Sequence, residues 1–288
     1  MRIGRQRLLA AAFLAFGLAV SIPASFAAGA NQADGVTETG LDARGHLRAV
    51  ATGRGESFAY MRLEQGVQVR IGQIAKNVIF YGPQTVRVNA NLGENYWTAP
   101  SLAVTGKSQR IAFTTSETAD TLTLQSARLR VEISKKTGAL RFLDAAGKLY
   151  TEENRDAPQI LKKVVVSGAP TFEAANRFTL RPDEAIYGLG FLGEESSNRR
   201  GKELLLVQTN VGIVIPVLMS SRRYGILWDT YSQMRFKDDA NGASMWAESA
   251  PGGVDYYFMG GDTPDAVVAA YRALTGQAPM YPKQAFGL

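Results

Sequence analysis

Residues 127–143 read Ala-Arg-Leu-Arg-Val-Glu-Ile-Ser-Lys-Lys-Thr-Gly-Ala-Leu-Arg-Phe-Leu, and this stretch decides the fold class. Its alternating apolar positions are Leu129, Val131, Ile133, Leu140 and Phe142. A period of two places these side chains on one face of an extended chain. Residues 134–138 have the composition of a turn, and so have residues 144–148 after the second run. The stretch therefore predicts a meander of half-buried antiparallel strands.

The same alternation extends outward from about Ser57. Residues 67–71 and 86–88 alternate apolar with polar side chains and predict further half-buried strands. Longer apolar runs predict strands buried on both faces, at residues 160–166, 204–207, 213–219 and 224–228. Because proline cannot donate a ladder hydrogen bond, Pro216 predicts an edge strand or a bulge.

A single amphipathic helix is predicted late in the chain. Thr263 suits the N-cap, Pro264 the first helical position and Gly276 the stop. The residues expected on its apolar face are Val267, Val268, Tyr271 and Leu274. Because no helical pattern separates the earlier strands, a doubly wound α/β fold is excluded. We predict an all-β, antiparallel β-sandwich over residues 28–261, followed by a linker helix within residues 262–288.

The first 27 residues have the pattern of a secretory signal peptide. Three arginines precede an apolar run at residues 8–20, and Ser25, Phe26 and Ala27 form a small-x-small cleavage site. A membrane helix needs about 20 apolar residues, and this run is too short. We expect an exported protein, periplasmic or secreted, with no membrane association after cleavage.

Composition narrows the function classes. The 288 residues include 32 basic and 26 acidic ones, for a net charge of +6, but three of the arginines belong to the leader. Since no Lys/Arg block remains, a nucleic-acid partner is not expected. The absence of cysteine excludes disulfides and thiolate chemistry. The single histidine, His46, lacks flanking partner residues, so we predict neither a metal site nor another cofactor.

Paired carboxylates and clustered glycines are open to two interpretations. Glycoside hydrolysis uses two carboxyl groups about 5–10 Å apart. The neighbouring pairs here are Glu152 with Glu153, Glu194 with Glu195, and Asp238 with Asp239. We interpret them as solvated loop residues, because neighbours in turns point apart. The sequence Tyr-Gly-Leu-Gly at residues 187–190 is not followed by a helical pattern, so its glycines favour close backbone approach in a sheet over phosphate binding.

Five aromatic residues are candidates for stacking on sugar rings or for the core, namely Trp97, Trp228, Trp246, Tyr256 and Tyr257. Trp228 lies inside the apolar run Tyr-Gly-Ile-Leu-Trp, which favours the core. Trp97 lies in a turn-rich segment and is the better candidate for an exposed platform.

An ordered series of motifs carries a family resemblance. Its members are residues 184–190, 198–202, 208, 210, 215–216, 220–221, 224–229, 255–258, 260–261, 271, 274–276 and 279–287. As a set they resemble the N-terminal β-sandwich of glycoside hydrolase family 31, especially its α-xylosidase-like members. The resemblance implies a galactose mutarotase-like supersandwich. It also implies retaining, exo-acting hydrolysis of α-glycosides by two Asp residues of a (β/α)8 barrel. No residue here matches those two, so we assign no catalytic residue.

The resemblance further implies a loop that shapes the sugar pocket. It corresponds to Gln208, Asn210 and Gly212, to which we add Phe191, where the family usually has Glu or Gln. Gly212 stands where many α-glucosidase members carry a pocket Asp, so both α-xylosides and α-glucosides stay open as substrates. An oligosaccharide or small α-glycoside is the expected ligand.

Residues 285–288 read as the first barrel strand. We therefore expect a chain cut off at that point, inactive alone, with the missing catalytic barrel as its intramolecular partner. One alternative is a free-standing periplasmic carbohydrate-binding β-sandwich module. A purely structural domain would instead expose a large apolar face.

Overall fold

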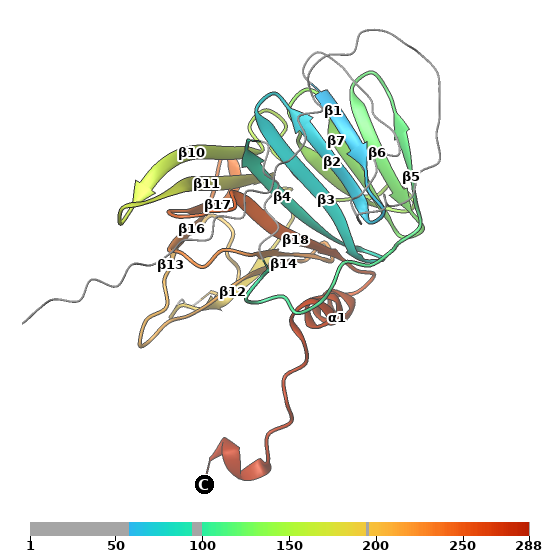
Figure 1. Ribbon diagram of the computed structural model, residues 1–288. Coiled ribbons are helices and arrows are strands. Elements are labelled where there is room, and N and C mark those ends of the chain that lie inside the picture. Colours follow the sequence, from blue (N-terminus) through green and yellow to red (C-terminus); the bar gives the residue numbers. More distant parts are fainter. Residues whose placement is uncertain (1–57, 94–99, 194–195, 288) are drawn as a thin grey trace, which may run out of the picture. The chain divides into compact units, whose positions relative to one another are not determined.

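The computed structural model of the chain describes residues 58–93, 100–193 and 196–287. The expected leader, His46, Trp97, Glu194 and Glu195 lie outside them. The described residues form two antiparallel sheets, followed by an α-helix and a 3-10 helix (Figure 1). The predicted all-β antiparallel sandwich is confirmed.

The first sheet has eight strands. In spatial order they are β1 (Phe58–Arg62), β2 (Gly66–Ile71), β3 (Ile74–Gly82), β4 (Thr85–Leu92), β18 (Val254–Gly260), β15 (Tyr224–Trp228), β14 (Ile213–Ser220) and β12 (Ile186–Phe191). Strands from both ends of the described chain therefore meet at its centre, where β4 pairs with β18.

The second sheet has ten strands. Its main path is β13 (Glu203–Leu206), β16 (Met234–Asp239), β17 (Gly242–Ala247), β11 (Ala169–Thr179), β9 (Leu149–Glu153), β8 (Leu140–Asp144), β7 (Leu129–Ser134), β6 (Thr121–Ser126) and β5 (Phe113–Glu117), while β10 (Gln159–Val166) pairs with β11 off this path. Val131 lies opposite Phe142, so the apolar residues of the two strands share one face, as predicted. The predicted meander is β7, β8 and β9.

The core lies between the two sheets. The Phe142 ring of the second sheet stacks on the Phe258 ring of the first, with ring centroids 4.2 Å apart. Trp228 belongs to this core, as the sequence favoured. Tyr256 and Tyr257 are fully buried, so neither is a surface platform for a sugar. Trp246 is half-buried, and its indole donates to Glu173 at 3.2 Å.

Burial on both faces was predicted for four runs and holds only for β15. The prediction is wrong for β10, in which every residue is at least partly exposed. It is also wrong for β13, an edge strand, and for β14, where Ile213 and Ile215 stay exposed. An apolar run shows that a strand has an apolar surface, but not which neighbour covers it.

The glycines of β12 allow it to pair closely with β14. A Cβ at Gly188 or Gly190 would overlap a backbone carbonyl of β14, and both residues have positive φ. The register shifts between them, and Pro216 lies within the resulting bulge. This confirms one of the two predictions for Pro216 and the structural interpretation of the glycines.

Helix α1 (Pro264–Thr275) has the predicted limits, and Thr263 Oγ1 accepts a hydrogen bond from the Ala266 amide at 3.2 Å. Val267 and Leu274 are buried, but the prediction for Val268 is wrong, because its side chain is 42% exposed. Successive helical residues are rotated by about 100°, so Val268 turns away from the sheet when Val267 faces it.

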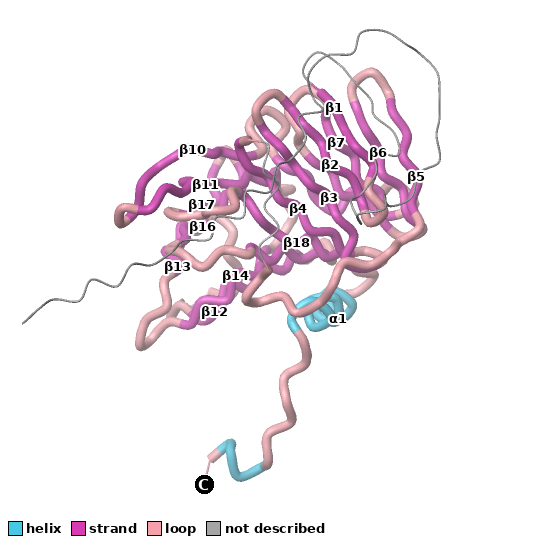
Figure 2. Tube along the Cα trace, viewed as in Figure 1, coloured by secondary structure: helices cyan, strands magenta, loops and turns pink. Residues whose placement is uncertain are grey.

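Residues 283–286 form a short 3-10 helix, η1 (Lys283–Phe286), instead of the predicted buried strand. None of its residues is buried, and no described strand pairs with it. Among the described residues, helix is confined to α1 and η1 (Figure 2). Neither has the length and apolar character of a membrane span.

Candidate functional site

The predicted loop, residues 208–212, joins β13 to β14 and is held by its own hydrogen bonds. Gln208 Oε1 accepts from the Val214 amide at 3.0 Å, and the Thr209 amide donates to the Gly212 carbonyl at 3.1 Å. Asn210 and Val211 are exposed at its tip. The loop therefore presents an amide side chain and an apolar side chain from a fixed backbone.

Phe191 lies beside this loop because it ends β12 and pairs with Ile213. Its side chain is 68% exposed. Arg199, which is buried, donates to the carbonyls of Gly188 and Gly190 at 3.2 and 3.3 Å and so supports the bulged strand. The structure thus brings Phe191 close to the loop that contains Gln208, Asn210 and Gly212.

Exposed apolar side chains lie on β12, on β14 and in the loop that precedes β14. They are Tyr187, Phe191, Val211, Ile213 and Ile215, and we name them the β12–β14 surface. Several exposed apolar side chains on two paired strands are typical of a surface that another protein element covers.

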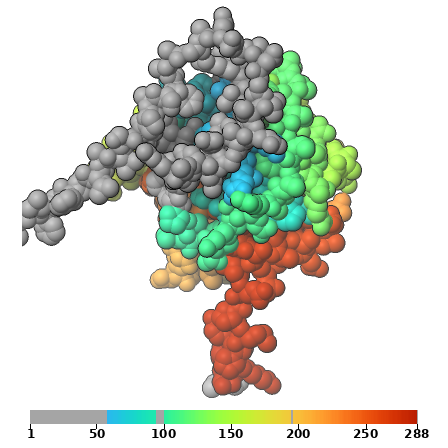
Figure 3. Space-filling model, turned by 45° about the vertical axis from the view of Figure 1, so that its right-hand side comes forward, coloured from blue at the N-terminus to red at the C-terminus, as the bar shows by residue number. Residues whose placement is uncertain are grey.

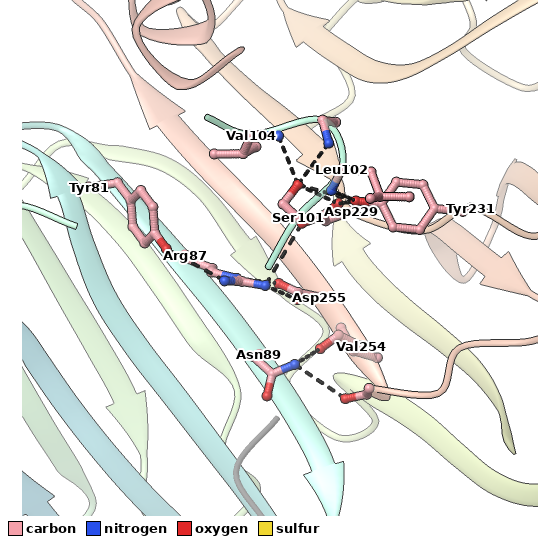
Figure 4. A network of polar contacts seen from close by, with 12 residues as sticks. Tyr81, Arg87, Asn89, Ser101, Leu102, Val104, Asp229, Tyr231, Val254 and Asp255 are labelled. Atoms are coloured by element: carbon pink, nitrogen blue, oxygen red, sulfur yellow. Dashed lines mark hydrogen bonds and ion pairs between the residues drawn. The ribbon is translucent and has the colours of Figure 1, made fainter. Parts of the chain in front are cut away.

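A cleft of about 310 Å³ lies at the same end of the first sheet, and the sequence did not reveal it. Leu227 pairs with Val217, and Trp228 with Tyr256. The end of β15 and the start of β18 therefore lie at the sheet end where β14 begins. The lining includes Gly252 and Gly253. It also includes five residues with polar side chains, which Figure 4 labels, namely Arg87, Ser101, Asp229, Tyr231 and Asp255.

Arg87 and Asp255 form the floor of this cleft. Arg87 Nε and Nη2 donate to the two carboxylate oxygens of Asp255 at 2.9 and 2.6 Å, and the guanidinium lies 5.4 Å from the centre of the Tyr257 ring. Burial raises the pKa of Asp255 to about 6, although the hydrogen bonds and charge of Arg87 act in the opposite direction. Burial alone would lower the pKa of Arg87, but hydrogen bonds to Asp255 outweigh it and raise that pKa.

Asp229 lies on the other side of Arg87, with Oδ2 3.8 Å from Nη2. Its Oδ1 accepts from Ser101 Oγ at 3.0 Å and from the Tyr231 hydroxyl. The Tyr231 hydroxyl also accepts from the Leu102 amide at 2.6 Å. Burial, followed by the hydrogen bond to Asp229, raises the pKa of Tyr231.

The segment that carries Ser101 also contacts helix α1. The amides of Thr105 and Gly106 both donate to the Leu274 carbonyl, at 3.0 and 2.8 Å, which satisfies a carbonyl in the last turn of the helix. Figure 3 shows this segment in green beside the red C-terminal residues. Helix and cleft therefore share the outer face of the first sheet, the helix over its apolar part and the cleft over its charged part.

All three carboxylate pairs were predicted to be solvated, and this is wrong for one member of each of the two pairs that lie among the described residues. Glu153 is 1% exposed and pairs with Lys76 at 2.9 Å. Asp238 is 7% exposed and accepts from Arg200 Nε at 2.8 Å. Both pairs lie in strands instead of turns, where neighbours alternate between faces. In the part of the chain that the structure describes, no group of three His, Cys, Asp or Glu side chains is suited to a metal ion.

Comparisons with known proteins agree on one family. A family model described as the glycosyl hydrolase 31 N-terminal galactose mutarotase-like domain matches residues 77–237, more than half of the chain. An alpha-xylosidase of Saccharolobus solfataricus is 31% identical over 229 residues, which cover 76% of this chain and 30% of that enzyme. Alpha-glucosidase 2 of Bacillus thermoamyloliquefaciens is 28% identical over 225 residues, which cover 72% of this chain and 27% of that enzyme.

A solved structure supports the same fold. The alpha-xylosidase of Xanthomonas citri matches with a TM-score of 0.71 and 19% identity, over 78% of this chain and 41% of the other. The chain spans less than one third of the length of either sequence relative.

Proposed function

The chain belongs to glycoside hydrolase family 31 through its N-terminal galactose mutarotase-like domain, and we propose that this domain forms one wall of an α-glycosidase sugar pocket. It is homologous to α-xylosidases and α-glucosidases over part of their length. The proposed substrate is an oligosaccharide or small α-glycoside with a terminal xylose or glucose.

One observation carries this proposal. Asn210 and Phe191 are both exposed at one end of the first sheet, and each is held by backbone that hydrogen bonds and strand pairing fix in place. A backbone that is already fixed reduces the conformational entropy lost when a ligand binds. Asn210 would hydrogen-bond sugar hydroxyls, and Phe191 would cover an apolar face of the sugar.

The β12–β14 surface supports the second half of the proposal. Val211 is 82% exposed and Ile213 is 53% exposed, beside the same loop. A catalytic (β/α)8 barrel packed on this surface would bury these side chains and bring the loop to its mouth. The two catalytic Asp residues would come from that barrel. The proposed location of the protein is the periplasm or the medium.

The first experiment asks whether this chain is catalytic alone. Residues 28–288 would be purified and assayed with aryl α-xylosides and α-glucosides. We expect no hydrolysis, because acid/base catalysis needs positioned groups that we do not find among the described residues. Turnover above the buffer rate would overturn the assignment of catalysis to a barrel.

The second experiment tests the loop. Residues 58–276 would replace the matching domain of the Saccharolobus solfataricus α-xylosidase, and Asn210→Ala would be introduced into the chimera. We expect KM to rise about tenfold, as for one lost hydrogen bond of about 1.4 kcal/mol, with kcat changing less. Asn241→Ala, at an exposed turn between β16 and β17, is the matched control. Equal kinetics in the two variants would contradict the role of Asn210.

A further inference from the structure

The cleft contains a carboxylate oxygen with spare capacity to accept hydrogen bonds. Asp229 has a side chain only 3% exposed, and its Oδ1 accepts hydrogen bonds from Ser101 Oγ and the Tyr231 hydroxyl. Among the described residues, Oδ2 accepts no hydrogen bond and meets only the 3.8 Å approach of Arg87. This oxygen can therefore accept a hydrogen bond from water or from a ligand in the cleft.

The charges around the cleft indicate what it would accept. Arg87 carries one positive charge, while Asp229 and Asp255 together carry two negative charges when ionised. An anionic ligand would meet two carboxylates beside a guanidinium whose best donors already serve Asp255. A neutral polyol suits the site better, because its hydroxyls can both donate to carboxylates and accept from Arg87.

Tyr231 provides an aromatic wall. Its side chain is 59% exposed, yet its hydroxyl is held by Asp229, Ser101 and the Leu102 amide. A large exposed side chain normally moves freely, whereas this ring is fixed in orientation at the mouth of a polar cleft. Aromatic rings combine apolar faces with polar edges, and a pyranose ring also has an apolar face.

We propose that the cleft is a carbohydrate-binding site, in which Asp229 and Arg87 bind the hydroxyls of one or two sugar rings and Tyr231 stacks on one of them. The volume of about 310 Å³ is at the small end of ligand pockets, which favours a monosaccharide or disaccharide over a longer chain. The cleft and the loop at residues 208–212 share no lining residue. The inference rests on the proposed function only for the choice of sugars to test.

The test is a titration of residues 28–288 with xylose, glucose and maltose at pH 7.5, followed by saturation-transfer NMR. We expect a dissociation constant of about 1 mM for at least one sugar. Tyr231→Ala should weaken sugar binding at least tenfold, and Asp229→Asn should weaken it about tenfold. Tyr231→Phe keeps the aromatic ring and should weaken sugar binding only about threefold. Thermal unfolding of each variant would verify that it is folded.

Matched variants separate this cleft from the loop. Tyr187→Ala removes a half-exposed tyrosine of β12, and Asn241→Ala changes an exposed turn between β16 and β17; both should bind sugar like the parent chain. Loss of binding in Asn210→Ala with none in Tyr231→Ala would place the sugar at the loop, supporting the proposed function and overturning this inference. Binding of 1,4-diaminobutane or inorganic phosphate in place of sugar would overturn the proposal of a carbohydrate site. The absence of detectable binding to every sugar at concentrations up to about 50 mM would also overturn it.

Discussion

Glu153 in the core and Asp229 at the open end of the first sheet are both almost fully buried carboxylates, but they differ in what they accept. Four donors reach Glu153, two on each oxygen: Asn176 Nδ2 at 3.1 Å and Tyr256 OH at 2.8 Å, then Lys76 Nζ and the Leu140 amide, each at 2.9 Å. Asp229 has donors on one oxygen only. Burial alone therefore does not distinguish a carboxylate with both oxygens hydrogen-bonded from one with an unfilled acceptor beside a cleft.

Lys76→Met is expected to give the largest effect. It leaves Glu153 charged and without its cation inside the sandwich, which should lower the free energy of unfolding by about 3–5 kcal/mol. Urea denaturation followed by circular dichroism would measure the loss. The double variant Lys76→Met, Glu153→Leu should recover part of it. A loss below about 1 kcal/mol in the single variant would remove the contrast between core and cleft.

The second prediction concerns pH and the Asp255 side of the cleft. Because the pKa of Asp255 is raised to about 6 in the folded chain, against about 3.9 when unfolded, the folded state holds the extra proton between these values. This carboxyl should therefore make stability fall as pH rises from about 4 to 6, by up to about 3 kcal/mol. Asp255→Asn should remove that slope. Unfolding curves of parent and variant at several pH values would measure the dependence of stability on pH. The same dependence in both proteins would contradict the prediction.

A smaller effect on stability is expected for Asp229→Asn. Arg87 keeps its two hydrogen bonds to Asp255, and the cleft admits water, so the loss should stay below about 1 kcal/mol. Denaturation under the conditions used for Lys76→Met would measure it. A loss as large as that of Lys76→Met would show that Asp229 is a structural charge like Glu153.

The smallest effect on stability is expected at the loop tip. Val211→Ser changes an 82% exposed side chain and should alter the free energy of unfolding by less than about 0.5 kcal/mol. It should, however, reduce binding of an apolar dye to the β12–β14 surface. Fluorescence titration would detect this, with Val165→Ser, also exposed but on β10, as control. An equal reduction in both variants would contradict a special role for this surface.

Local patterns predicted much of the fold. The period of two located the hairpin of β7 and β8, and Thr263 and Gly276 delimited α1, because strand alternation and helix capping depend on residues near in sequence. A bulge at Pro216 was one of the two possibilities predicted from the missing amide donor of proline. The loop residues Gln208, Asn210, Gly212 and Phe191 came from motif resemblance, and strand pairing brings them together.

The sequence by itself determined that the chain would form a β-sandwich, since alternation of polar and apolar side chains is a local property. Only the tertiary structure decided which charges are buried together. Arg87 and Asp255 are 168 residues apart and meet because β4 pairs with β18, while Asp229 reaches them because β15 lies next in the sheet. The order of the strands is set by packing of the whole sheet, so the residue pattern of a single strand cannot predict it.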